Sequence, residues 1–283
     1  MSRSLGEAAP AQSDDLAHIH DSVSRTLSSP SLWTEREVEG EVKRPFRPNT
    51  LNTLLTLLLA IALILAAACS SGSGVPTSDV AGAIPWPASE SLSYVVKDRK
   101  GADLGKIVLA VDAQGSTTKL SQRFQGANTT DNSTVVVDSR TLKPVSSSRE
   151  IETSRDDEKI EVTYSDQGAL IKQGDDKQSG LSVPEHAYDN DSSLFLWRTL
   201  PFAEGYHARY ITVVTNRRSR ADVDLRVVGK ESVRVPAGTF TAWRLEIRAT
   251  GVKQVAWYAD TPARTLVRYD NDNGLIYELE RVP

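Results

Sequence analysis

An uninterrupted apolar run, Leu51–Ala68, constrains this chain more than any other feature. Its eighteen residues carry no charge, and as an α-helix they would span about 27 Å, close to the hydrocarbon thickness of a bilayer. Lys43, Arg44 and Arg47 stand just before the run, and the next charge after it is Asp79. Because basic residues are retained on the cytoplasmic side, the run predicts a membrane-targeted chain whose C-terminal part is exported.

The end of the run resembles the lipobox of bacterial lipoproteins. Three alanines, Ala66–Ala68, stand directly before Cys69, which is the only cysteine, and Ser and Gly residues follow it. The resemblance implies that Cys69 receives a diacylglyceryl group and becomes the N-terminal residue after cleavage. Ala66 stands where the lipobox favours leucine, so an uncleaved signal anchor, with Leu51–Ala68 as a single membrane helix, remains the alternative.

Composition divides the chain into four parts. Residues 1–50 are polar and lack a sustained apolar period, which predicts a disordered cytoplasmic segment or the n-region of a signal. Residues 51–68 are the hydrophobic signal or membrane helix, and residues 69–89 are the lipidated cysteine with a flexible tether rich in Gly, Ser and Pro. Residues 90–283 are the predicted extracytoplasmic domain, anchored to the cell membrane.

Charge and cysteine content exclude several classes of function. The formal net charge is −4 and no strongly basic region is present, whereas nucleic-acid binding requires clustered positive charge. A single cysteine cannot form an internal disulfide. The four histidines show no zinc-ligand spacing and the single cysteine offers no pair. We therefore expect no nucleic acid, no metal and no cofactor.

After residue 90 the sequence consists of short runs in which apolar and polar residues alternate. Lys106–Asp112, for example, places three aliphatic side chains on one face, and clusters of Gly, Asp, Asn and Ser separate such runs. This pattern predicts an all-β, mainly antiparallel fold. Separate strands are expected over Asp222–Val228 and Val233–Val235. The last hairpin turns at Asn271–Gly274, where Gly274 supplies a positive φ.

One helix interrupts the strands. Asp189, Asn190 and Asp191 provide capping oxygens and negative charge before an apolar stretch, Ser192–Leu200, and Pro201 stops it. The helix is too short and too hydrophobic to stand alone. We therefore expect it to plug or cover one side of the sheet.

Three stretches of the C-terminal half carry a further resemblance. They read NDSSLFLWRTLPFAEG (Asn190–Gly205), VRVPAGTFTAWRLEI (Val233–Ile247) and VAWYADTPARTLVRY (Val255–Tyr269). With the closing hairpin they resemble a family of exported, strand-rich bacterial domains of unknown function, often lipoproteins. The resemblance spans roughly Ser91–Val282. It implies an architecture similar to the curved, half-open β-barrels of lipoprotein carrier and receptor proteins, and it implies no catalysis.

The densest polar cluster comes just before the helix. Its members are Glu185, His186, Asp189, Asp191, Ser192 and Ser193. A Ser/His/Asp arrangement can be drawn from them, but no strand–turn–helix nucleophile elbow surrounds either serine. Calcium and zinc spacings are also missing. The cluster is better interpreted as a loop with a helix cap, so no catalytic residue is assigned and the chain is not expected to be an enzyme.

The function expected first is a binding module for a lipidic or hydrophobic ligand or an envelope component. The candidate cleft residues are Trp197, Trp243 and Trp257, each of which also suits an ordinary core position. A structural or assembly protein acting through protein contacts comes second, and a hydrolase third. An open apolar cavity of roughly several hundred Å³ would favour the first and a packed core the second. The sequence leaves the ligand, the strand order and the oligomeric state open.

Overall fold

The computed structural model describes residues 78–283 apart from 175–176, 250 and 283. The predicted signal or membrane helix at Leu51–Ala68 and the predicted lipidation of Cys69 lie outside the described residues. Within the described part of the chain, no helix combines the length and the apolar character that crossing a membrane requires.

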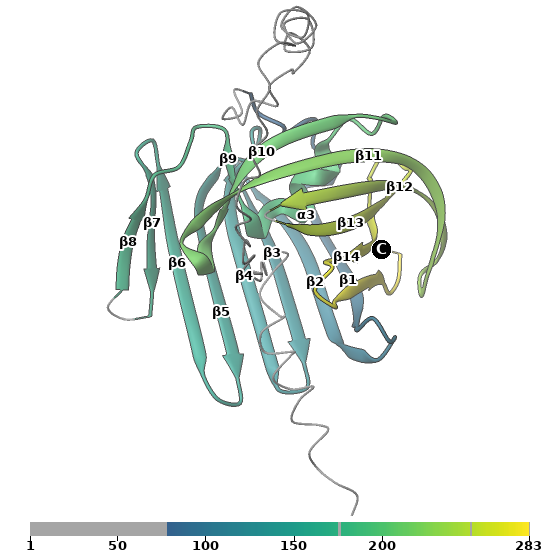
Figure 1. The fold of residues 1–283 in the computed structure, drawn as a ribbon, viewed down its shortest axis with the longest axis horizontal. Helices are drawn as coiled ribbons and strands as arrows, with labels where there is room; N and C mark the ends of the chain where they lie inside the picture. Colours follow the sequence, from purple (N-terminus) through teal and green to yellow (C-terminus); the bar gives the residue numbers. More distant parts are fainter. Residues whose placement is uncertain (1–77, 175–176, 250, 283) are drawn as a thin grey trace, which may run out of the picture. The chain divides into compact units, whose positions relative to one another are not determined.

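The described residues form one curved sheet of fifteen strands (Figure 1). The first arm of the sheet consists of β1 (Ser89–Lys97), β2 (Asp103–Gln114), β3 (Thr117–Gly126), β4 (Thr129–Asp138), β5 (Pro144–Thr153), β6 (Asp157–Ser165), β7 (Gly168–Gln173) and β8 (Lys177–Leu181). The second arm consists of β9 (Ala187–Asp189), β10 (His207–Val214), β11 (Ser219–Val235), β12 (Gly238–Ala249), β13 (Val252–Ala259), β14 (Leu266–Asp270) and β15 (Ile276–Leu279).

Each arm is a meander, and the pairing of β1 with β15 joins them. All neighbouring strands are antiparallel except β9 and β10, which are parallel. The two edge strands, β8 and β9, are consecutive in the chain, so the short loop Ser182–His186 connects the opposite edges of the sheet. Contacts of β9 with β5 and of the following residues with β3 and β4 bring the arms together.

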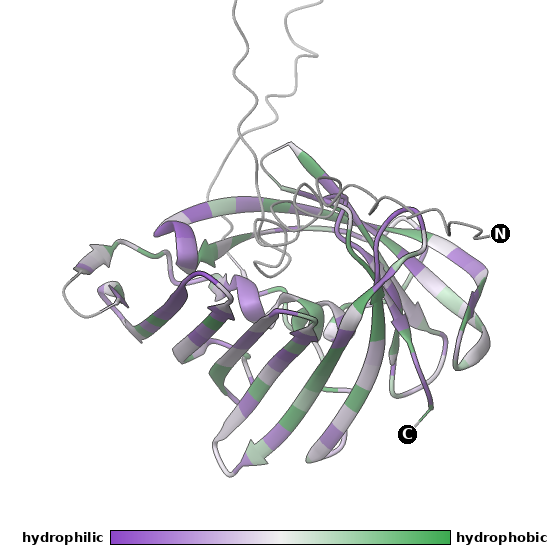
Figure 2. Ribbon diagram, turned by 90° about the horizontal axis from the view of Figure 1, so that it is seen from below, coloured by the Kyte–Doolittle hydropathy of each residue, from purple (hydrophilic) through white to green (hydrophobic). Residues whose placement is uncertain are grey.

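Alternation of apolar and polar residues builds the strands. In β2, Ile107, Leu109 and Val111 are buried while their neighbours are more exposed, because successive side chains of a strand point to opposite faces. Figure 2 shows the same alternation along many of the strands. One face of the sheet therefore turns inward, and the space between the arms must be filled.

A short helical segment, Asp189–Leu200, fills much of that space, and we call it the plug. It comprises η1 (Asn190–Ser192), α3 (Ser193–Leu196) and η2 (Trp197–Thr199). The Asp189 side chain accepts a hydrogen bond from the backbone of Asp191 and caps the first turn. Leu200 is already extended, as expected before Pro201. The predicted plugging helix is confirmed, although it is more irregular than one α-helix.

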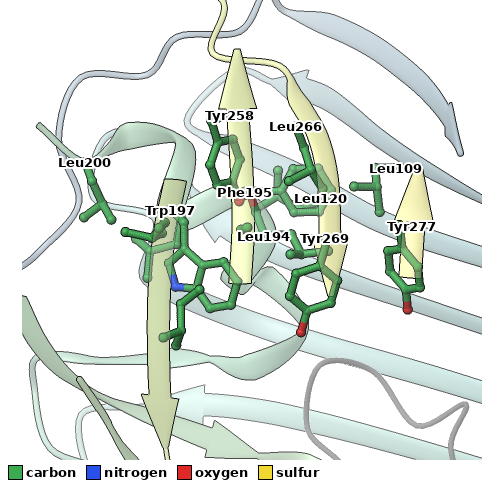
Figure 3. Close-up of a cluster of buried hydrophobic side chains, with 14 of the residues drawn as sticks. Leu109, Leu120, Leu194, Phe195, Trp197, Leu200, Tyr258, Leu266, Tyr269 and Tyr277 are labelled. Carbon is green, nitrogen blue, oxygen red and sulfur yellow. Dashed lines mark hydrogen bonds between the residues drawn. The ribbon is translucent and has the colours of Figure 1, made fainter. Parts of the chain in front are cut away.

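The core is packed around the plug (Figure 3). The plug side chains meet side chains from both arms, among them Leu109, Leu120, Leu194, Phe195, Trp197, Leu200, Tyr258, Leu266, Tyr269 and Tyr277. Burying each large apolar side chain contributes about 1.5–3 kcal/mol. The polar atoms are paired as well: the Trp197 indole donates to the Tyr210 hydroxyl, and the Tyr258 hydroxyl donates to the carbonyl of Leu194, both at 2.8 Å.

The predicted all-β, mainly antiparallel curved sheet is confirmed. The closing hairpin is confirmed too, with a φ of 103° at Gly274. One prediction was wrong: Asp222–Val228 and Val233–Val235 belong to a single strand, β11. A register shift against β12 between Val227 and Gly229 lets this long strand bend with the sheet, which is the usual effect of a β-bulge.

Candidate functional site

An open cleft of about 660 Å³ lies beside the loop that connects β8 to β9, and we call it the seam cleft. The start of β5, the end of β6 and the loop itself supply its walls. Its apolar lining consists of Pro144, Val145, Val183, Pro184 and Ala187. Val145 is 45% exposed, which is unusual for an aliphatic residue next to a packed core. Clefts of about 300–1,000 Å³ with this mixed lining commonly bind small molecules.

Lys143 lies at one side of the seam cleft. Its ammonium group contacts the Asp79 carboxylate at 2.5 Å and lies 4.1 Å from the centroid of the Tyr188 ring. Burial lowers the pKa of Lys143, although Asp79 partly opposes the effect. Burial also disfavours ionisation of Asp79, but hydrogen bonds from Lys143 and His186 outweigh it and lower the pKa of Asp79. The side of the cleft is thus an ion pair held against an aromatic ring.

Tyr164 connects the seam cleft to the buried interior. The ring lines the cleft, and its hydroxyl donates to the Asp189 carboxylate at 2.6 Å. Burial raises the pKa of Asp189 to about 7, and the neighbouring Asp191 acts in the same direction. Burial, and then Asp189, likewise raise the pKa of Tyr164. The base of the cleft therefore rests on a carboxyl group that changes its charge near neutral pH.

Beneath Tyr164 a buried ionic network attaches the plug to the first arm. Arg149 on β5 donates two hydrogen bonds to Asp131 on β4, and its guanidinium lies 3.8 Å from the Asp191 carboxylate. Gln122 on β3 donates to the backbone carbonyl of Asp191. Such bidentate Arg–carboxylate pairs fix geometry as well as charge. The network sets the position of the plug and therefore one wall of the cleft.

A second, smaller groove lies at the other end of the plug, and we call it the rim groove. It has a volume of about 380 Å³ and is lined by residues 83–85, 259–262, Phe202, Trp243 and Arg264. Phe202 stacks on Trp243 with a centroid distance of 6.2 Å. The Trp243 indole donates to Asp260 at 2.8 Å. The groove therefore presents aromatic edges beside one carboxylate and one guanidinium.

Comparison with protein families gives the chain its relationship. The model for a protein family of unknown function, DUF3108, matches residues 92–279. The chain belongs to the DUF3108 family. The predicted membership of a strand-rich family of unknown function is confirmed. The matched residues extend from β1 to β15 and include the plug.

Several solved structures are similar to this DUF3108 chain. A β-barrel-like protein of the domain of unknown function DUF1849 from Brucella abortus is 10% identical, with 69% of this chain and 96% of that chain covered and a TM-score of 0.45. A protein described as a lipoprotein, from Parabacteroides distasonis, is 13% identical, with 73% and 100% covered and a TM-score of 0.29. A protein described as exported and YmcC-like in fold, from Bacteroides fragilis, is 14% identical, with 73% and 100% covered and a TM-score of 0.27. No curated protein matches the chain.

The three tryptophans proposed for a ligand cleft lie in three different environments of the DUF3108 domain. Trp197 is 2% exposed in the core. Trp243 lines the rim groove. Trp257 follows the buried Ala256 on β13 and points to the other face, where its indole donates to Glu231. A role in ligand contact stays a prediction, and the geometry leaves it with Trp243.

The polar cluster before the plug is dispersed among separate partners. His186 bonds to Asp79 at 2.9 Å. The Ser192 hydroxyl donates to the carbonyl of Asp189 at 2.7 Å, and Ser193 pairs with the hydroxyl of Tyr210. Among the residues that the structure describes, no group of three or more His, Cys, Asp or Glu side chains could hold a metal ion.

Sequence reasoning did not find Lys143, Tyr164 or the Arg149–Asp131 pair. A signal for the pair was present: Asp131 and Arg149 occupy inward positions of alternating strands. A charged residue at such a position indicates a buried partner. Lys143 and Tyr164 carry no comparable signal, because half-buried lysines and tyrosines are common at strand ends.

Proposed function

We propose that this DUF3108 domain is a non-catalytic binding module for a lipidic or hydrophobic ligand. In this proposal the domain is held outside the cytoplasm by acyl chains on Cys69, and the ligand occupies the seam cleft. The single observation that supports it best is the cleft itself. It is open, its volume of about 660 Å³ suits a small amphipathic molecule, and aliphatic and proline side chains line it.

The packed interior favours a surface site over a site beneath the plug. Leu194, Trp197 and Leu200 are at most 2% exposed, and their contacts with both arms leave an apolar ligand no place without displacing the plug. Such displacement would expose several large apolar side chains, each at a cost of about 1.5–3 kcal/mol. The seam cleft can accept a ligand while the core stays packed.

The anchor and the cleft fit together in length. Asp79, at the seam cleft, follows Cys69 by only ten residues, which span at most about 36 Å when fully extended. An acylated Cys69 would therefore hold the cleft close to the membrane surface, from which a lipidic ligand would come. Several acyl chains together give firm attachment, since each buried CH₂ contributes about 0.8 kcal/mol.

Native mass spectrometry of the full chain, extracted from membranes in mild detergent, tests both parts. We expect a polypeptide that begins at Cys69 and carries acyl mass, with a second, noncovalent lipid-sized adduct. An intact chain that retains Leu51–Ala68 would instead indicate a signal anchor. Absence of the noncovalent adduct would remove the support for a ligand site.

A matched pair of substitutions locates the ligand. Val145→Asp places a charge inside the seam cleft, and Leu170→Asp places the same charge outside it, at a position of similar exposure, 47% against 45%. We expect the first variant to lose the lipid adduct and the second to keep it. Equal loss in both variants, or retention in both, would contradict binding at the seam cleft.

A further inference from the structure

The residues just before the sheet form a strap, Asp79–Trp86, that lies across the plug. The strap is outside the strands and helices. The backbone amides of Val80 and Ala81 both donate to the hydroxyl of Tyr188. Farther along, the amide of Gly82 donates to the Thr199 hydroxyl at 3.0 Å. The strap thus touches both ends of the plug through hydroxyl groups of the plug and the strand before it.

Specific side chains fix each end of the strap. At one end the Asp79 carboxylate is shared by Lys143, at 2.5 Å, and His186, at 2.9 Å. At the other end Trp86 is 9% exposed. Its ring packs edge-on against Phe195, and the Arg198 guanidinium lies over it. An anion site and an aromatic pocket therefore bracket the strap.

The middle of the strap approaches the plug too closely for a side chain. A Cβ atom at Gly82 would clash with the carbonyl oxygen of Thr199. The contact surface therefore selects three features at fixed spacing: a carboxylate, then a glycine, then an aromatic residue. Together these features describe a recognition site for a peptide segment.

This contact surface continues into both open sites. Asp79 lines the seam cleft, and residues 83–85 line the rim groove. We call the surface under the strap, from Lys143 and His186 to Phe195 and Arg198, the track. A segment that leaves the track uncovers a continuous path between the cleft and the groove.

The strap can leave without breaking the sheet. The ladder pairings of the sheet begin at Ser89, and the family match begins only at Leu92. Pro85 and Pro87 flank Trp86, and the preceding residues 70–78 are rich in Ser and Gly. Segments held by few hydrogen bonds, at the end of a domain, open at lower free energy than core strands.

We propose that the track is an interaction surface for the strap of a second copy of this chain, so that two neighbouring copies exchange straps. Exchange of an identical element needs no new contact, because every contact already exists within one copy. Two copies tethered to one membrane also meet at a high effective concentration. The proposal goes beyond ligand binding and does not depend on it.

Two complementary variants of the full chain test the exchange. Gly82→Val blocks the seating of a copy's own strap but leaves its track intact. Lys143→Glu repels Asp79 and spoils the track but leaves the strap intact. Each variant alone should be monomeric by native mass spectrometry, and their mixture should give a one-to-one heterodimer. A mixture that stays monomeric, or a dimer of Gly82→Val alone, would overturn the exchange.

A peptide in trans provides a second measurement, and near-UV circular dichroism first verifies that each variant is folded. A fluorescent peptide of residues 78–89 should bind Gly82→Val at least about tenfold more tightly than the wild type, whose own strap competes for the track. The same peptide carrying Gly82→Val should not bind. Failure of the wild-type peptide to bind the folded Gly82→Val chain overturns the proposal. Peptide binding without the heterodimer would assign the track to a segment of another protein instead.

Discussion

At its N-terminal end the plug meets three carboxylates and one guanidinium, whereas at its C-terminal end it meets two guanidiniums and one carboxylate. The first group consists of Asp131, Asp189, Asp191 and Arg149, with the hydroxyl of Tyr164 at its edge. All four charged side chains are at most 7% exposed. Negative charge is therefore in excess inside a region that excludes water.

The C-terminal end solves the opposite problem. Arg198 pairs with Glu90 at 2.5 Å and also donates to the carbonyls of Ala263 and Arg264. Arg264 donates to the carbonyls of Arg198 and Leu200. The excess positive charge is thus shared among backbone oxygens.

The difference follows from what a protein interior can offer to each charge. Backbone carbonyls at the ends of helices and strands are plentiful acceptors for a guanidinium. A buried carboxylate needs donors, and when these do not suffice it binds a proton. The raised pKa values of Asp131 and Asp189, both caused first by burial, agree with this account. We infer that the N-terminal attachment of the plug depends on pH and the C-terminal attachment does not.

The largest effect is expected from removing the guanidinium at the N-terminal end. Arg149→Ala leaves Asp131 and Asp191 buried without their cation, which typically costs about 3–5 kcal/mol. Urea denaturation of the full chain measures the free energy of unfolding. As a control, Lys159→Ala removes a cation whose pairs with Glu150 and Glu161 are exposed, and it should leave the midpoint unchanged. Equal effects of the two substitutions would contradict a buried network.

A smaller effect is expected at the C-terminal end. Glu90→Gln removes the only carboxylate described there, but Arg198 keeps its two carbonyl acceptors. The loss should be near that of a hydrogen bond to a charged group, about 1.5–3 kcal/mol. The same urea titration checks it. If Glu90→Gln proved as costly as Arg149→Ala, the backbone carbonyls would not be compensating the guanidinium.

Local features of this architecture were readable in the sequence. The alternating runs predicted strands, and Asn271–Gly274 predicted the closing turn, because both depend on neighbouring residues. Asp189 and Pro201 likewise bracketed the plug. These features record the conformational preferences of short segments, which survive in the folded chain.

Long-range features were not readable. The pairing of β1 with β15 joins residues near opposite ends of the domain, and no local pattern specifies it. The continuity of β11 through Val227 and Gly229 depends on β12 beside it. Asp79 and Trp86 lie in a segment that looks like a plain tether, because only the folded plug gives them partners. For the same reason the candidate site could not be assembled from the sequence, apart from Trp243 in the rim groove.

The smallest and most selective prediction concerns the proton on Asp189. Its pKa rises from an ordinary value of 3.8 to about 7 in the folded chain, so the folded state binds the proton more tightly. The stabilisation this confers is complete below the unfolded pKa and is lost as pH rises through 7. Asp189→Asn keeps an acceptor for Tyr164 and for the amide of Asp191 but cannot ionise. Between pH 5 and pH 8 we therefore expect the wild type to lose on the order of 1 kcal/mol relative to Asp189→Asn. Urea titrations of both chains at each pH measure this difference, and parallel pH profiles would show that the N-terminal attachment of the plug holds no titrating proton.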